Sequence, residues 1–123
     1  MADDLPEMIR THIRSVWALE LLLLLRRSSD RVWRVQELSD ELRATRAIVD
    51  TCVAYFERIG LVARDDDGRL RYAPASSMMA EFCDSLDAEY RRRPVAVINV
   101  IAAPEDRIQQ LADAFRFSPR DSK

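Results

Sequence analysis

Arginine supplies nearly all the positive charge of this chain, and its characteristic chemistry is the binding of anionic groups. The 123 residues include 19 lysines and arginines, of which only Lys123 is lysine. Between residues 26 and 46, six arginines stand against four acids, whereas the whole chain has a net charge of −2. A guanidinium presents a planar fork of N–H donors that fits phosphate well. The stretch therefore predicts a local phosphate-binding patch on a protein that is not basic as a whole.

The residues on which most enzymes and metal sites depend are scarce. The chain has one histidine, His12, and two cysteines, Cys52 and Cys83, which lie far apart in apolar stretches. Two glycines leave no glycine-rich phosphate loop, and no Ser/His/Asp set or pair of carboxylates is recognisable. We expect no catalysis, no metal, no cofactor and no disulfide, with both cysteines buried. A redox response through Cys52 or Cys83 is the alternative.

Helices must position most of the arginines. Apolar residues recur at three- and four-residue steps from Leu5 to Arg27, which predicts one helix over this range. Its end is apolar on nearly all sides in the run Leu21 to Leu25, so we expect a partner subunit to cover part of it. Next, residues 31–35 alternate charged and apolar side chains, as a short strand or an extended link does.

Two helices joined by a tight turn are predicted next. The first runs from about residue 35 to Arg43. Thr45 is a suitable N-cap for the second, which extends to about Ile59, because its hydroxyl can accept a free backbone N–H. Gly60 then stands where a left-handed residue ends a helix.

A β-hairpin follows the second of these helices. Two short alternating runs, 61–64 and 69–72, flank an Asp-Gly turn that contains Gly68, the second glycine. The acidic run Asp65 to Asp67 is expected to be a solvated turn and not a calcium site.

The remainder of the chain is expected to be helical. Ser76 or Ser77 can cap a helix that ends in Arg91-Arg92-Arg93, whose cations complement the helix dipole. The apolar residues 94–101 fit a strand or a buried helix, and we favour the helix. A last amphipathic helix is expected from Pro104 to about Phe115.

This order of elements resembles the winged helix-turn-helix transcription regulators, and in style the MarR superfamily most closely. The matching stretch is residues 45–62, TRAIVDTCVAYFERIGLV, which looks like that family's recognition helix with its closing Glu, Gly-Leu and first wing strand. The resemblance spans roughly residues 16–74. It implies a mostly α fold with a small β-hairpin, a winged helix-turn-helix with additional C-terminal helices.

The resemblance also implies a function, a DNA-binding transcriptional regulator. A recognition helix at about residues 45–59 would enter the major groove, and a wing at about residues 61–72 would contact the phosphate backbone. Carried over by position, the nucleic-acid-binding residues are those on the exposed helix face, at the turn and on the returning wing strand. They are Thr45, Arg46, Ala47, Thr51 and Tyr55 on the helix, Arg43 at the turn, and Arg69 and Arg71 on the wing.

Some residues depart from that pattern and leave a second hypothesis open. Ala47, Ile48 and Tyr55 stand where small polar or basic residues are usual, and Asp50 and the acidic wing tip would repel phosphate. The alternative is a winged helix that does not bind DNA and docks a protein through its Ile48 and Tyr55 face, since apolar and aromatic anchors suit such use.

The expected organisation is a winged-helix domain over 1–75, a C-terminal helical dimerisation or packing segment over 76–117 and a tail over 118–123. The expected partners are double-stranded DNA and a second copy of the chain, bound through the first helix and the C-terminal helices. The acidic N-terminus lacks the features of a secretory signal. The longest apolar run is about half the roughly 20 residues of a membrane span. We therefore expect a cytoplasmic protein without a membrane anchor.

Overall fold

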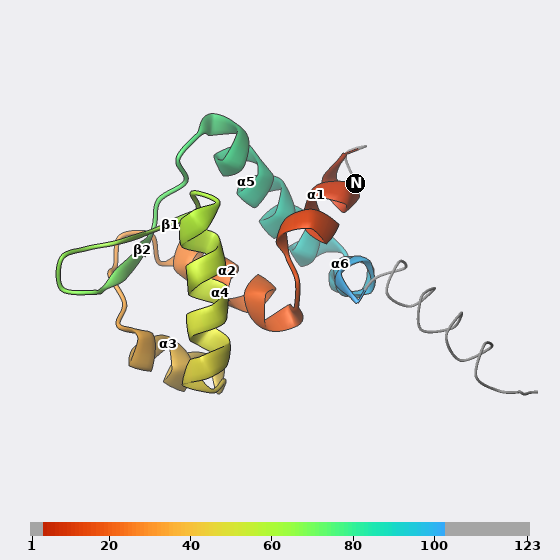
Figure 1. The fold of residues 1–123 in the computed structure, drawn as a ribbon. Coiled ribbons are helices and arrows are strands. Elements are labelled where there is room, and N and C mark those ends of the chain that lie inside the picture. Colours follow the sequence, from red (N-terminus) through yellow and green to blue (C-terminus); the bar gives the residue numbers. More distant parts are fainter. Residues whose placement is uncertain (1–3, 103–123) are drawn as a thin grey trace, which may run out of the picture.

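The computed structural model describes residues 4–102, which form six helices and one antiparallel hairpin (Figure 1). In chain order the elements are α1 (Leu5–His12), α2 (Val16–Arg27), α3 (Val35–Leu42), α4 (Arg46–Arg58), β1 (Val62–Arg64), β2 (Leu70–Tyr72), α5 (Ser77–Arg92) and α6 (Pro94–Ile101). The part of the chain described is thus mostly helical with a small β-hairpin, as the sequence predicts. The helix expected after Pro104 lies outside these residues.

The prediction of one helix from Leu5 to Arg27 is wrong, because the chain breaks between α1 and α2. Ile13 is extended, with φ −109° and ψ 101°, although its side chain stays buried. Ser15 then begins α2, where its hydroxyl accepts a hydrogen bond from the backbone N–H of Ala18 at 3.1 Å. The apolar periodicity continues across the break, whereas the N-cap at Ser15 sets the start of a second helix.

The leucine-rich helix α2 is the centre of the fold, and its run of leucines is covered by this chain's own elements. It packs against α3, α4, α5 and β2. Leu21, Leu22, Leu23 and Leu25 are each no more than 2% exposed. No partner subunit is needed to explain the apolar run Leu21 to Leu25. The apolar character of this run is therefore no reason to expect a subunit interface there.

The α3–α4 pair has the tight turn and the helix ends that the sequence predicts. Arg43 ends α3 in the left-handed region, with φ 54°, and the side chain of Thr45 accepts a hydrogen bond from the backbone N–H of Ile48 at 3.2 Å. Gly60 follows α4 with φ 82°, where an added Cβ would lie 3.0 Å from the Ala75 Cβ. Glycine is therefore required by both conformation and space.

The hairpin joins the end of α4 to α5, and an extended segment is bonded to the first residue of β2, next to the hairpin turn. Its register pairs Ala63 with Arg71, and Gly68 forms the turn with φ 81°. Trp33 and Leu70 exchange two backbone hydrogen bonds of 2.7 Å. The stretch expected to be a strand or an extended link is thus extended and bonded to β2 at a single bridge.

Helices α1, α5 and α6 pack against one another beside this unit (Figure 1). Ser76 caps α5 by accepting from the backbone N–H of Met79, and Pro94 begins α6, so both helix predictions are confirmed. One cluster of buried residues runs from Leu5 to Ile101. The winged-helix domain and the C-terminal helical segment, which the sequence predicts to meet near residue 75, therefore contribute residues to one core.

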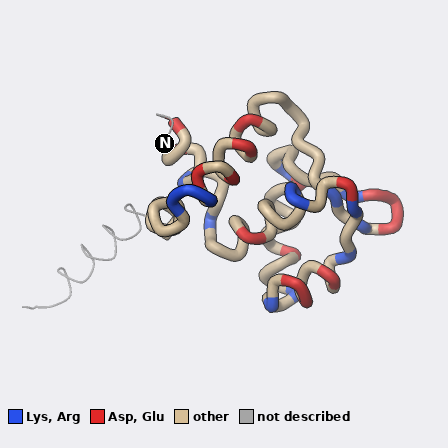
Figure 2. Tube along the Cα trace, turned by 180° about the vertical axis from the view of Figure 1, so that it is seen from behind, with Lys and Arg blue, Asp and Glu red and all other residues tan. Residues whose placement is uncertain are grey.

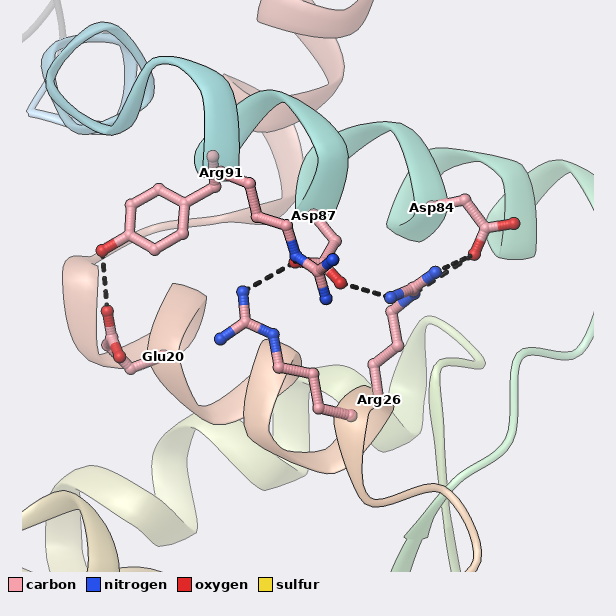
Figure 3. Close-up of polar contacts among 7 residues, drawn as sticks. Glu20, Arg26, Asp84, Asp87 and Arg91 are labelled. Atoms are coloured by element: carbon pink, nitrogen blue, oxygen red, sulfur yellow. Dashed lines mark hydrogen bonds and ion pairs between the residues drawn. The ribbon is translucent and has the colours of Figure 1, made fainter.

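A polar network joins α2 to α5 (Figure 3). Asp87 on α5 has a side chain only 3% exposed and forms ion pairs with Arg26, Arg27 and Arg91. Arg26 also binds Asp84 at 2.7 Å. The arginines at the end of α5, expected to complement its dipole, also make specific ion pairs with acids one turn earlier in the helix.

Candidate nucleic-acid interface

The outer surface of α4 is a narrow face of mostly small side chains between two arginines. We call it the α4 face and define it by the exposed residues of the helix, which recur at helical spacing. They are Arg46, Ala47, Asp50, Thr51, Ala54 and Arg58. On the opposite side of the helix, Val49, Val53 and Phe56 are buried and fix which face points outward.

The start of α4 presents two arginines. Arg43 and Arg46 are exposed on either side of the Thr45 cap. Neither makes an ion pair with an acid of residues 4–102. The helix dipole adds partial positive charge at the same end. This end of α4 is suited to an anionic group.

Tyr55 does not lie on the α4 face, contrary to the sequence prediction. It is half-buried against the end of α1, where its hydroxyl donates to the backbone oxygen of Thr11 at 3.2 Å and lies 3.2 Å from Nδ1 of His12. The guanidiniums of Arg14 and Arg58 lie 4.5 Å and 5.3 Å from its ring centroid. The reason is the break before α2, which brings residues 11–14 against this side of α4.

The hairpin arginines differ in how far they are engaged within the chain. Arg69 precedes β2 and pairs with Asp65 at 3.3 Å and with Asp67 at 3.0 Å. Arg64 pairs with Glu57 on the last turn of α4 at 2.9 Å. Arg71, by contrast, is exposed on β2 and has no acidic partner within the described part of the chain. The expected phosphate contact therefore fits Arg71 better than Arg69.

Asp65 organises the tip of the hairpin. Its carboxylate accepts hydrogen bonds from the backbone N–H groups of Asp67 and Arg69, both at 2.9 Å. The backbone hydrogen bond from Arg69 is the largest influence on the pKa of Asp65, which lies below its ordinary value. The acidic tip is thus an ordered turn in which carboxylates form ion pairs with Arg69.

The expected site residues at the start of α4 and on the hairpin form two groups at opposite ends of the helix, and Thr51 and Tyr55 lie between them along α4. Arg43, Thr45, Arg46 and Ala47 are at its start, beside α3, whereas the hairpin adjoins its last turns (Figure 1). A helix of 13 residues is roughly 20 Å long. The two groups can therefore reach an extended anionic surface but cannot hold one small anion together.

Basic residues do not form a continuous stripe along the chain trace. Figure 2 shows acidic positions on α3 and at the hairpin tip alternating with the basic positions of the turn and hairpin. A separate basic run lies at the junction of α5 and α6, on the opposite side of the molecule from the hairpin (Figures 1 and 2). Asp50 adds a negative charge within the α4 face itself.

Sequence reasoning missed two members of the α4 face, Ala54 and Arg58. Both follow Ala47 and Thr51 at steps of three and four, so helical periodicity could have identified them. The sequence also gave no sign that Arg14 meets Tyr55, because that contact depends on the unexpected helix break.

Comparison of the chain with protein-family models, curated proteins and solved structures finds no match to any of them. Among residues 4–102, no three His, Cys, Asp or Glu side chains are grouped so that they could hold a metal ion. None of the helices in the same range has both the length and the apolar character that crossing a membrane requires.

Proposed function

We propose that this chain is a winged helix-turn-helix protein that binds double-stranded DNA and regulates transcription. In this proposal α3 and α4 are the helix-turn-helix, α4 is the recognition helix and the β1–β2 hairpin is the wing. Arg43 and Arg71 contact phosphates, while Thr45, Arg46, Ala47 and Thr51 face the major groove.

The observation that supports this proposal best is the composition of the α4 face. A helix can enter the major groove, which is about 12 Å wide, only where its exposed side chains allow close approach. Here the central positions are Ala47, Asp50, Thr51 and Ala54, and none is bulky. Arg46 stands at the N-terminal end, from which recognition helices contact base edges.

The arrangement around α4 supports the same proposal. The left-handed residue Arg43 and the Thr45 cap turn the chain sharply from α3 into α4. The hairpin is tied to the far end of α4 through the Arg64–Glu57 ion pair. An anion-binding helix start and an exposed Arg71 on the hairpin could then reach phosphates on both sides of a groove.

Docking of a protein partner is the second candidate, and the charge distribution favours it. Asp50 and the acidic hairpin tip oppose binding to phosphate, and two of the three hairpin arginines are paired with acids of the chain. The surface first expected to serve this role is less available, because Ile48 and Tyr55 are both half-buried.

A homodimer and a cytoplasmic location remain part of the proposal. With the leucines of α2 enclosed, the exposed apolar side chains that could meet a second copy include Trp17, at 40% exposed, and Val95 on α6, at 68%. A two-fold dimer would recognise a pseudo-palindromic site with half-sites about one helical turn apart. Sedimentation measurements would give the oligomeric state.

The proposal can be tested without knowing the target sequence. The full chain is used to enrich duplexes from a random double-stranded pool, and the affinity for the enriched duplex is measured by fluorescence anisotropy. Arg46→Ala should weaken binding by about 1–3 kcal/mol and relax the sequence preference, because it removes a base-edge contact.

Arg10→Ala is the matched control, since it removes the same charge from an exposed position on α1 that is not among the proposed DNA-binding residues. It should leave affinity and preference unchanged. Failure to enrich any sequence, or equal losses in the Arg46 and Arg10 variants, would exclude specific DNA binding and leave the protein-docking candidate.

A further inference from the structure

A pocket of about 580 Å³ lies between the end of α1, the segment that links it to α2, and α4. This volume falls in the range of small-molecule sites in proteins. Its lining is formed by His12, Arg14, Ser15, Ala18, Thr51, Cys52, Ala54, Tyr55, Phe56 and Arg58. The pocket exists because the chain breaks after α1 and brings residues 12–15 against α4.

The charge of the pocket is positive and uncompensated. Arg14 and Arg58 both lie over the Tyr55 ring, and no aspartate or glutamate belongs to the lining. Neither arginine forms an ion pair with an acid anywhere in residues 4–102. An anion bound in the pocket would meet no acid of the lining and could pair with these guanidiniums.

The remaining polar groups of the lining are neutral. Burial, followed by the nearby charge of Arg14, lowers the pKa of His12, so its ring carries no charge at pH 7. Burial likewise raises the pKa of Cys52, which leaves the thiol protonated. His12, Thr51 and Ser15 can therefore contribute hydrogen bonds without adding charge.

Apolar surface completes the pocket. Ala54 and the half-buried ring of Tyr55 supply the accessible part of this surface, since Ala18 and Phe56 of the lining are only 5% and 0% exposed. A ligand that is only an inorganic anion would leave this surface without contacts. A ligand with an apolar body would remove it from water, at about 25 cal/mol for each Å² buried.

We propose that this pocket binds a small organic phosphate monoester, with the phosphoryl group paired with Arg14 and Arg58 and an apolar body against Ala54 and the Tyr55 ring. The charge balance distinguishes a phosphate monoester from a carboxylate. The monoester has a charge near −2 at pH 7, which matches two guanidiniums with no competing acid, and its oxygens accept the paired N–H donors of arginine. The pocket shares Thr51, Ala54 and Arg58 with the α4 face, but the proposal does not rest on DNA binding.

The test uses phenyl phosphate as the probe, with inorganic phosphate, benzoate and benzamide as comparisons, added to the full chain in a buffer without phosphate. Calorimetry gives the affinities, and amide chemical shifts report the location. Phenyl phosphate should bind at least tenfold more tightly than each comparison compound, with shifts concentrated in residues 12–18 and 51–58.

Arg14→Gln and Arg58→Gln should each weaken phenyl phosphate binding at least fivefold, and the double variant should abolish it. Arg10→Gln, in the last turn of α1 but outside the pocket lining, should not change it. Circular dichroism establishes that the variants are folded, and Arg14→Gln changes the pocket without changing a residue of the α4 face. The proposal is overturned if benzoate or benzamide binds as tightly as phenyl phosphate, if the double variant retains binding, or if phenyl phosphate does not bind.

Discussion

Individual arginines of this chain differ mainly in whether the fold already supplies them with an acid. Arg64 and Arg69 have close carboxylate partners, whereas Arg43, Arg46 and Arg71 have none among residues 4–102. Sequence position alone predicts the same phosphate contact for Arg69 and Arg71, since both follow the same hairpin turn. Their environments give them different capacities to hold phosphate.

We therefore predict that Arg71→Ala lowers DNA affinity more than Arg69→Ala does. Loss of one phosphate contact should reduce the slope of log affinity against log salt by about 0.9 for Arg71→Ala. Arg69→Ala should change the slope by less, because its charge is already offset by Asp65 and Asp67. Anisotropy titrations at four or more salt concentrations measure both slopes. Equal slopes for the two variants would show that the intramolecular ion pairs do not decide phosphate contact.

Gly60, which follows α4, and Gly68, in the hairpin turn, have the same backbone conformation but different surroundings. Gly60 and Gly68 have φ of 82° and 81°, yet only Gly60 has a neighbour, Ala75, where a Cβ would be added. An L-residue in this conformation costs about 1–2 kcal/mol. Spatial crowding should add to that cost at Gly60 alone.

Gly68→Ala should accordingly lower the free energy of unfolding by about 1 kcal/mol, and Gly60→Ala should lower it by more. Urea unfolding followed by circular dichroism measures both. Because both glycines have the same backbone conformation, the comparison isolates the effect of crowding at Gly60. If Gly60→Ala costs no more stability than Gly68→Ala, the close approach to Ala75 is contradicted.

Local signals explain which elements the sequence could predict. The Thr45 and Ser76 caps, Gly60 and the Asp-Gly turn each act within a few residues, so α4, the hairpin and α5 were predictable. The break before Ser15 was not, because Ile13 stays buried and keeps the apolar period intact across the extended residue. The same missed break accounts for the position of Tyr55 and for the pocket beside it.

Long-range packing decided the rest of the site. The pairing of Arg14 and Arg58 over Tyr55 joins residues from a link and a helix, and no spacing in the sequence encodes it. The enclosure of the leucines in α2 likewise depends on four elements that surround it. A pattern of apolar residues shows that a face is buried but does not show whether the same chain or another covers it.

At the scale of the whole molecule, the buried carboxylate of Asp87 links the central helix to α5. Burial alone would raise the pKa of Asp87, but the hydrogen bond from Arg27 and the charges of Arg27, Arg26 and Arg91 outweigh it, so the pKa is lowered. A carboxyl whose pKa falls on folding stabilises the protein above its unfolded pKa of about 4, and this stability is lost as the pH falls through the lower folded value.

Asp87→Asn should reduce the free energy of unfolding at pH 7 by about 2 kcal/mol, because it removes charge-assisted hydrogen bonds to arginines. The variant should also lose less stability than the wild type on acidification from pH 5 to pH 2. Urea titrations across that range measure both effects. Asp84→Asn is the control, since its side chain is 63% exposed while sharing Arg26, and its effect should stay below about 1 kcal/mol. Equal effects of the two substitutions would contradict the special role of the buried carboxylate.

The paired backbone bonds between Trp33 and Leu70 have a consequence for local unfolding. They close the chain into a ring that contains α3, the turn, α4 and the hairpin turn, with the Trp33 indole buried at the closure. Opening of this ring exposes an aromatic core residue and frees both hydrogen bonds at once, so the elements inside it should open as one cooperative unit. The α4 face and the hairpin turn should therefore open together, and slippage of the hairpin alone is opposed by the segment that precedes α3.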